Sequence, residues 1–112
     1  MPRYCLTLDL QDDPAKIAKY ERYHQKIWPE IRDSLFAADV TGMEIYRYGT
    51  HMFMIMDVSD NFSFDKKTEM DVVNPKVIEW ENLMSTYQAV APGSDPVRHW
   101  ELMKQVFDLT KQ

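Results

Sequence analysis

The sequence of 112 residues contains one cysteine, only three glycines and no long apolar run. A single cysteine cannot form an internal disulfide, and the place of Cys5 in an alternating strand pattern favours a buried, inert thiol. No window approaches the ~20 apolar residues of a membrane helix, and the start, MPRYCLTLDLQDD, lacks the apolar segment of a signal peptide. These absences predict a cytoplasmic protein that binds no membrane.

Positive charge is also scarce, since 13 Lys and Arg residues stand against 18 Asp and Glu residues, for a net charge of -5. The adjacent Lys66 and Lys67 lie between Asp65 and Glu69, so no basic stripe is available for a phosphate backbone. We therefore expect no nucleic-acid partner.

Several motifs of common enzymes are missing. The chain has no glycine-rich phosphate loop, no GxSxG and no CxxC, which argues against dinucleotide, phosphate and serine-nucleophile chemistry. Its three histidines are too far apart in the sequence for a zinc motif: His24, His51 and His99. No metal site is predicted.

The apolar residues, 45% of the chain, recur with clear periods. Residues 4–10 alternate between apolar and polar side chains, as in a half-buried strand. Residues 40–48 and 51–58 are also typical of strands, and the intervening Gly49-Thr50 predicts a hairpin. The segment VRHWELMKQVFDL, residues 97–109, is expected to contain a last strand.

Proline marks the predicted helices. Asp13-Pro14 and Asn74-Pro75 each combine an N-cap residue with a proline at the first helical position. Pro29 lacks an amide hydrogen and clashes with the preceding turn, so the first helix should kink or restart near Trp28. After residues 60–64 we expect an irregular or short helical stretch before the second helix.

The resulting order, β-α-β-β-α-β, predicts a single α+β domain over residues 1–112. This order is typical of a ferredoxin-like sandwich, in which both helices cover one face of a four-stranded antiparallel sheet. The other face would leave apolar side chains such as Leu6, Tyr46 and Met54 in water. We therefore expect that face to be covered by a second copy in a homodimer, or to enclose a ligand.

Tyr20 and His24 are four residues apart and share one face of the first predicted helix. A phenol and an imidazole so placed can act as an acid/base pair on a small polar ligand. The alternative is a hydrogen-bonded core histidine beside a core tyrosine. Pro29 favours a pocket at this point, because an interrupted helix exposes side chains and backbone groups.

Tryptophan is frequent for so short a chain. The aromatic rings of Trp28, Trp80 and Trp100 are suited either to a core or to the C–H face of a sugar ring. The eight methionines are expected to be adaptable core or interface residues rather than part of a cofactor site.

Three motifs, YERYHQKIWPEI, EWENLM and VFDL, together resemble the bacterial L-rhamnose mutarotase family, over Arg3 to Leu109. The resemblance implies a fold of the dimeric α/β-barrel type. It also implies an isomerase that interconverts the α and β anomers of a 6-deoxy-L-hexose without cofactor or metal. A monosaccharide and a second copy of the chain are the partners that it implies.

The resemblance also assigns roles to residues. His24 matches the family's catalytic histidine, Tyr20 its sugar-binding tyrosine and Trp80 the first of two adjacent pocket tryptophans. Glu81 stands where the family has the second tryptophan, and Met43 where it has a pocket tyrosine, so the sugar can be L-fucose rather than L-rhamnose. The expected site residues are the following: catalytic His24 and Tyr20, and substrate-binding Trp28, Met43, Trp80 and Glu81.

Two other functions are compatible with such a fold, because fold alone does not fix function. A non-catalytic, dimeric small-molecule-binding module would bind a sugar without accelerating anomer exchange. A cofactor-free monooxygenase of the dimeric α/β-barrel type would consume oxygen with an aromatic substrate and would tolerate the loss of His24.

Overall fold

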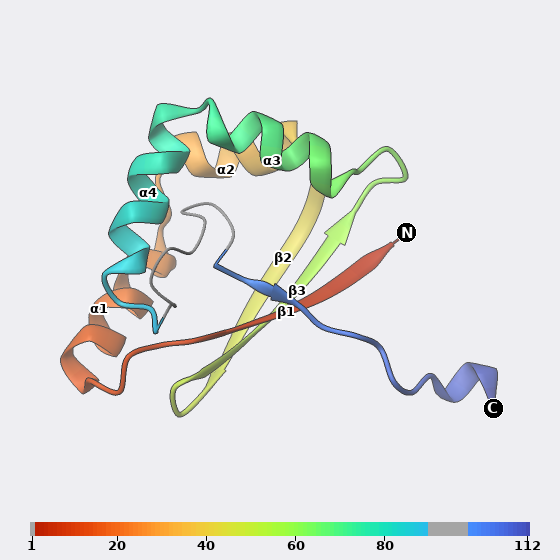
Figure 1. The fold of residues 1–112 in the computed structure, drawn as a ribbon, viewed down its shortest axis with the longest axis horizontal. Coiled ribbons are helices and arrows are strands. Elements are labelled where there is room, and N and C mark those ends of the chain that lie inside the picture. Colours follow the sequence, from red (N-terminus) through yellow and green to blue (C-terminus); the bar gives the residue numbers. More distant parts are fainter. Residues whose placement is uncertain (1, 90–98) are drawn as a thin grey trace.

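The computed structural model describes residues 2–89 and 99–112. Its four strands form one antiparallel sheet in the spatial order β2-β3-β1-β4 (Figure 1). This is the strand order of a ferredoxin-like sheet and confirms the predicted topology. The strands are β1 Arg3–Asp9, β2 Val40–Tyr48, β3 His51–Val58 and β4 Glu101–Leu102.

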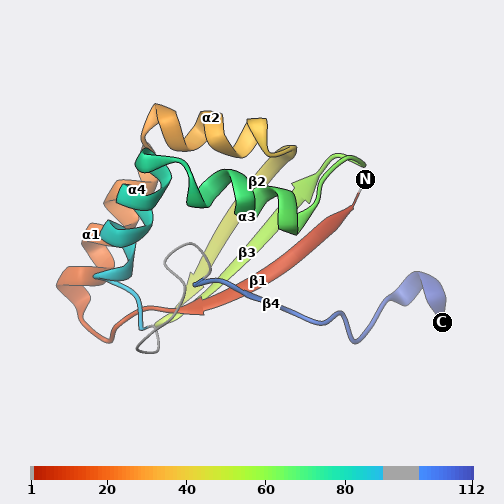
Figure 2. The same ribbon diagram turned by 45° about the horizontal axis from the view of Figure 1, so that its top comes forward.

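Four helices gather on one side of this sheet (Figure 2). They are α1 Pro14–Gln25, α2 Pro29–Ala37, α3 Phe64–Val72 and α4 Pro75–Ser85. Each of the two predicted helical regions is thus a pair of helices. The break between α1 and α2 lies where Pro29 predicts it, and Trp28, in an extended conformation, is the N-cap of α2. The described helices include none that is long and apolar enough to cross a membrane.

The predicted N-caps account for the start of α1 and of α4. The Asp13 carboxylate accepts hydrogen bonds from the amides of Ala15 and Lys16. The Asn74 side chain accepts from the amides of Lys76 and Val77 in the same way. Each cap accepts hydrogen bonds from first-turn amides that have no acceptor within the helix. The proline that follows each cap has no amide hydrogen, so it adds no unpaired donor to the first turn.

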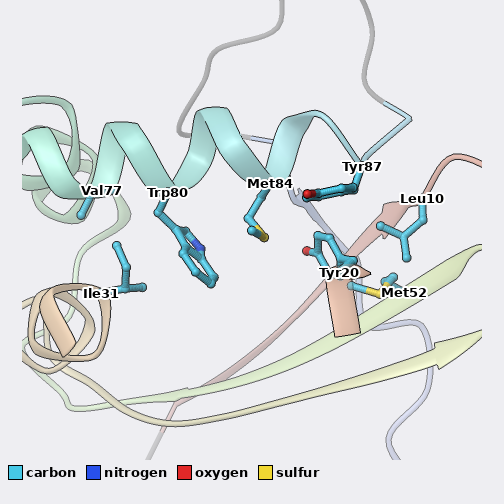
Figure 3. Packing of buried hydrophobic residues seen from close by; sticks show 8 residues of the cluster. All are labelled: Leu10, Tyr20, Ile31, Met52, Val77, Trp80, Met84 and Tyr87. Carbon is cyan, nitrogen blue, oxygen red and sulfur yellow. The ribbon is translucent and has the colours of Figure 1, made fainter. Parts of the chain in front are cut away.

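Alternation of side chains along β1 and β3 separates a helix-covered face of the sheet from an open face. In β3 the four residues of the covered face are all buried: Met52, Met54, Met56 and Val58. Met52 packs with side chains of α1, α2 and α4 in one core cluster (Figure 3). The other three belong to a second cluster, against which Leu35 of α2 and Phe64 of α3 pack. The intervening Phe53 and Ile55 are only half-buried and lie on the open face.

The placement of two side chains corrects the expectation for the open face. Leu6 and Met54 pair across β1 and β3, but both are buried on the helix-covered face. Tyr46 does lie on the open face and is 55% exposed. Cys5 is half-buried rather than buried, because it also points to the open face, opposite Ile55.

The last strand lies within the expected segment, residues 97–109, and has two residues. β4 pairs with Leu6 and Thr7 of β1 and ends at Leu102; residues 97 and 98 lie outside the described part. The chain then runs away from the sheet to a short 3₁₀ turn, Leu109–Lys111 (Figure 2). This tail carries exposed apolar side chains: Met103, Val106, Phe107 and Leu109.

Candidate functional site

A cavity of about 600 Å³ opens between the covered face of the sheet and the helices. This size is typical of a site for a small molecule. Apolar side chains such as Leu6, Met54 and Met56 form much of its wall. Six ionisable side chains also line it: Tyr20, His24, Lys67, Asp71, Glu81 and Glu101. The sequence-predicted pair on α1, Tyr20 and His24, lies on the wall of this cavity.

His24 is held by its own helix. Its Nδ1 atom lies 2.9 Å from the carbonyl oxygen of Tyr20, one turn earlier. Because a carbonyl only accepts, Nδ1 carries the proton of the neutral ring, and the lone pair remains on Nε2. Burial lowers the pKa of His24 from its ordinary 6.5, although the bond to the Tyr20 carbonyl opposes this change. The imidazole is therefore neutral at neutral pH and is ready to accept a proton.

The Tyr20 ring stacks on the His24 ring, with the centroids 4.4 Å apart. Its hydroxyl accepts a hydrogen bond from Nε2 of Gln88 at 3.3 Å. Burial raises the pKa of Tyr20 to about 12; the Gln88 bond opposes this rise, and the charge of Glu81 adds to it. At neutral pH the phenol is a hydrogen-bond donor rather than an anion.

Trp80 projects from α4 beside Met84, toward Ile31 of α2 (Figure 3). It is 5% exposed, lines the cavity and meets the His24 ring nearly edge-on, with the centroids 5.5 Å apart. Trp28 packs against Trp80 at 5.1 Å and carries Lys76 over its ring, but it is not among the cavity-lining residues. The structure thus places Trp28 behind Trp80.

Glu81 and Met43, the two positions that depart from the family pattern, both line the cavity. Burial raises the pKa of Glu81 to about 7; the positive charge of Lys67 opposes the rise and the negative charge of Asp71 adds to it. Near neutral pH, Glu81 therefore exists in both protonation states. It is able to donate a hydrogen bond in one state and to accept two in the other.

Sequence analysis missed several polar groups of this site, among them Lys67, Asp71 and Gln88. Lys67 and Asp71 of α3 form an ion pair at 2.5 Å on the cavity wall. Their i, i+4 spacing was a signal that could have identified them, once a helix was expected there. Gln88, which also lines the cavity, follows α4 and carries no sequence signal of its role.

Neither His51 nor His99 is among the residues that line the cavity. His51 is exposed and pairs with Asp9, 2.7 Å away. His99 is buried, with Nδ1 2.8 Å from Oε1 of Gln88, and the adjacent Trp100 lines the cavity. Within residues 2–89 and 99–112, no group of three or more His, Cys, Asp or Glu side chains is arranged to hold a metal ion.

The cavity therefore combines a neutral imidazole, a phenol and a carboxyl group with an aromatic wall. Such a set can bind hydroxyl groups, pack against a C–H face and move a proton between two oxygens of one ligand.

Comparison with known proteins agrees with this chemistry. Residues 3–109 match the L-rhamnose mutarotase family. The chain is 38% identical to an L-fucose mutarotase of Xanthomonas campestris pv. campestris, over 99% of this chain and 90% of that protein. It is 28% identical to an L-rhamnose mutarotase of Paraburkholderia phytofirmans, over 87% of each.

A solved structure has the same fold. The crystal structure of an L-rhamnose mutarotase from Formosa agariphila superposes with a TM-score of 0.73 and 21% identity, covering 97% of this chain and 99% of that one. Together with the match over nearly the whole sequence, the comparisons establish that this chain belongs to the L-rhamnose mutarotase family.

Proposed function

We propose that this protein is a mutarotase, an isomerase that interconverts the α and β anomers of a 6-deoxy-L-hexose. The observation that carries the proposal is the placement of His24 and Tyr20 beside Trp80 on one wall of a cavity of sugar-binding size. The family membership supports the same reaction. The proposed unit is one domain, residues 1–112, acting without cofactor or metal.

The proposed reaction starts with Nε2 of His24. This atom takes the proton of the anomeric hydroxyl as the C1–O5 bond breaks, and the imidazolium then gives a proton to O5. The products of this half-reaction are the open aldehyde and a free hydroxyl group. After rotation about C1–C2, the reverse steps close the ring on the other face. A positioned acid/base of this kind contributes ~10² to 10⁴ in rate.

Tyr20 is proposed to donate a hydrogen bond to the sugar, since its raised pKa keeps the phenol protonated. Trp80 would pack against the C–H face of the ring, and Trp28 would contribute by bracing Trp80 at 5.1 Å. Glu81 and Met43 would contact the substituents that distinguish one sugar from another. L-fucose is the favoured substrate, because the 38%-identical relative is named an L-fucose mutarotase.

The test is saturation-transfer proton NMR on the anomeric signals of L-fucose and L-rhamnose. His24→Ala should abolish the enzyme-dependent exchange while the circular dichroism spectrum stays unchanged. His51→Ala is the matched control, because His51 is exposed and pairs with Asp9 outside the cavity. Near-normal exchange by His24→Ala would refute the assignment.

Sugar preference tests the roles of Glu81 and Met43. Glu81→Trp and Met43→Tyr restore the side chains that the family pattern has at these positions, so the double variant should shift preference toward L-rhamnose. An unchanged ratio of the two exchange rates would show that neither residue selects the sugar. Sugar binding without any exchange would favour the binding module, and oxygen uptake with an aromatic substrate would favour the monooxygenase.

We also propose a cytoplasmic homodimer. Phe53 and Ile55 of the open sheet face, together with exposed Val106 and Phe107 of the tail, offer apolar surface that a second copy would bury. Sedimentation equilibrium should give twice the 13.3 kDa chain mass. A Phe53→Lys variant should be shifted toward monomer, and a monomeric wild type would contradict this proposal.

A further inference from the structure

A buried polar chain, made of Tyr20, Gln88 and His99, ends at the wall of the cavity. All three side chains are less than a tenth exposed. Nδ1 of His99 lies 2.8 Å from Oε1 of Gln88, and Nε2 of Gln88 lies 3.3 Å from the Tyr20 hydroxyl. Gln88 and His99 take no part in the proton transfer proposed above.

The direction of this chain follows from the atoms that can donate. The amide oxygen of Gln88 only accepts, so the contact with His99 requires a proton on Nδ1 of His99. With its oxygen facing His99, the amide turns its NH2 group to Tyr20, and this group donates to the phenol oxygen. Among the described residues the phenol has no other hydrogen-bond partner, so its own proton is free to point into the cavity.

The Gln88 backbone is anchored to the end of β1. Gln88 forms a bridge with Leu10, and the amide of Ala89 donates to the carbonyl of Asp9 at 2.8 Å. The side chain of Gln11 donates to the Gln88 carbonyl at 3.3 Å. A donor on so constrained a backbone holds the phenol in one orientation before substrate arrives.

We propose that Gln88, itself oriented by His99, is a positioning residue that makes the Tyr20 hydroxyl a donor to the ring oxygen of the sugar. This inference rests on the proposed mutarotase function. As the C1–O5 bond breaks, negative charge develops on O5, and a preoriented donor stabilises that charge more than it stabilises the ground state. The loss of this orientation should therefore lower kcat rather than raise KM.

The first variant is Gln88→Glu, which keeps the shape of the side chain. An ionised carboxylate only accepts, so it draws the Tyr20 proton away from the sugar. We expect kcat to fall about tenfold, with KM changed by less than about twofold. Asn82→Asp is the matched control, because it makes the same amide-to-carboxylate change at an exposed position of α4; its kcat should equal that of wild type.

The second variant, Gln88→Met, also removes the donor but adds no charge, and it decides the matter if Gln88→Glu does not fold. It is measured in the wild-type and in the Tyr20→Phe background, as a double-mutant cycle. We expect Gln88→Met to lower kcat by about threefold with Tyr20 present and to have no effect with Phe in its place. A purely structural role of Gln88 predicts equal losses in both backgrounds.

The outcomes separate the two proposals. Two results would refute the positioning role while wild type still exchanges the anomers, so that the mutarotase function stands. In the first, either Gln88 variant retains full kcat. In the second, Gln88→Met lowers kcat equally in the wild-type and the Tyr20→Phe backgrounds. If wild type accelerates exchange of neither L-fucose nor L-rhamnose, the proposed function is wrong, and the role of Gln88 falls with it. A loss of kcat that occurs with Tyr20 present, and not in the Tyr20→Phe background, supports both the positioning role and the mutarotase function.

Discussion

Glu81→Gln should stabilise the fold, and the gain should depend on pH. Burial raises the pKa of the Glu81 carboxyl from its ordinary 4.5 to about 7. Between these two values the folded chain holds a proton that the unfolded chain has released, so wild-type stability falls as pH rises through this range. The glutamine side chain of the variant resembles the protonated acid in shape and has no such titration.

The size of the effect follows from the shift in pKa. Each pKa unit corresponds to about 1.4 kcal/mol, so ionisation of Glu81 reduces the free energy of unfolding of wild type by about 3 kcal/mol once the pH is above 7. The difference in unfolding free energy between Glu81→Gln and wild type should therefore rise by about 3 kcal/mol from about pH 4 to about pH 8. Below pH 4.5 this contribution is absent.

The assay is urea unfolding followed by tryptophan fluorescence, at one protein concentration and several pH values. The lowered pKa of His24 changes stability in the opposite direction, but it does so in both proteins and cancels in the difference. Glu79→Gln is the matched control, since Glu79 lies on the same helix with its side chain 58% exposed. A difference for Glu81→Gln that varies by less than about 0.5 kcal/mol over the whole range would refute the argument.

Three further predictions concern stability and pH. Met84→Ala removes a core side chain that is 1% exposed and should lower the free energy of unfolding by about 2 to 5 kcal/mol; a loss under about 1 kcal/mol in urea unfolding would contradict its place in the core. Asn74→Ala should cost about 1 kcal/mol through loss of the α4 cap, measured against Asn82→Ala, which caps nothing. Because the pKa of His24 is lowered, kcat/KM of Glu81→Gln, which lacks the carboxyl that titrates near pH 7, should be constant down to below pH 6.5 and should fall only under more acidic conditions; an acid limb above pH 6.5 in this variant would exclude His24 as the titrating base.

The sequence predicted the elements that local chemistry controls. Alternation along residues 40–48 and 51–58 identified two strands with the bounds that the structure shows. The starts of α1 and α4 followed from Asp13 and Asn74, because a cap is made by a side chain and amides only two or three residues away. The spacing of Tyr20 and His24 placed the two rings together for the same reason.

Tertiary structure decided which face of the sheet each side chain occupies and how long the last strand is. The sequence correctly predicted that side chains alternate between two faces along the strands that carry Leu6 and Met54. A period of two does not say, however, which of the two faces the helices cover. β4 has only two residues, because strand length depends on the neighbour that supplies backbone partners rather than on the apolar content of residues 97–109.

By itself, then, the sequence determined the ferredoxin-like order, the helix starts and the pairing of Tyr20 with His24, all of which depend on near neighbours in the chain. Only the tertiary structure decided that Glu81 faces a cavity with Lys67 and Asp71, and that Gln88 donates to Tyr20. Burial changes a pKa, and a hydrogen bond fixes the direction of a proton, only after distant segments enclose the group and exclude water from it.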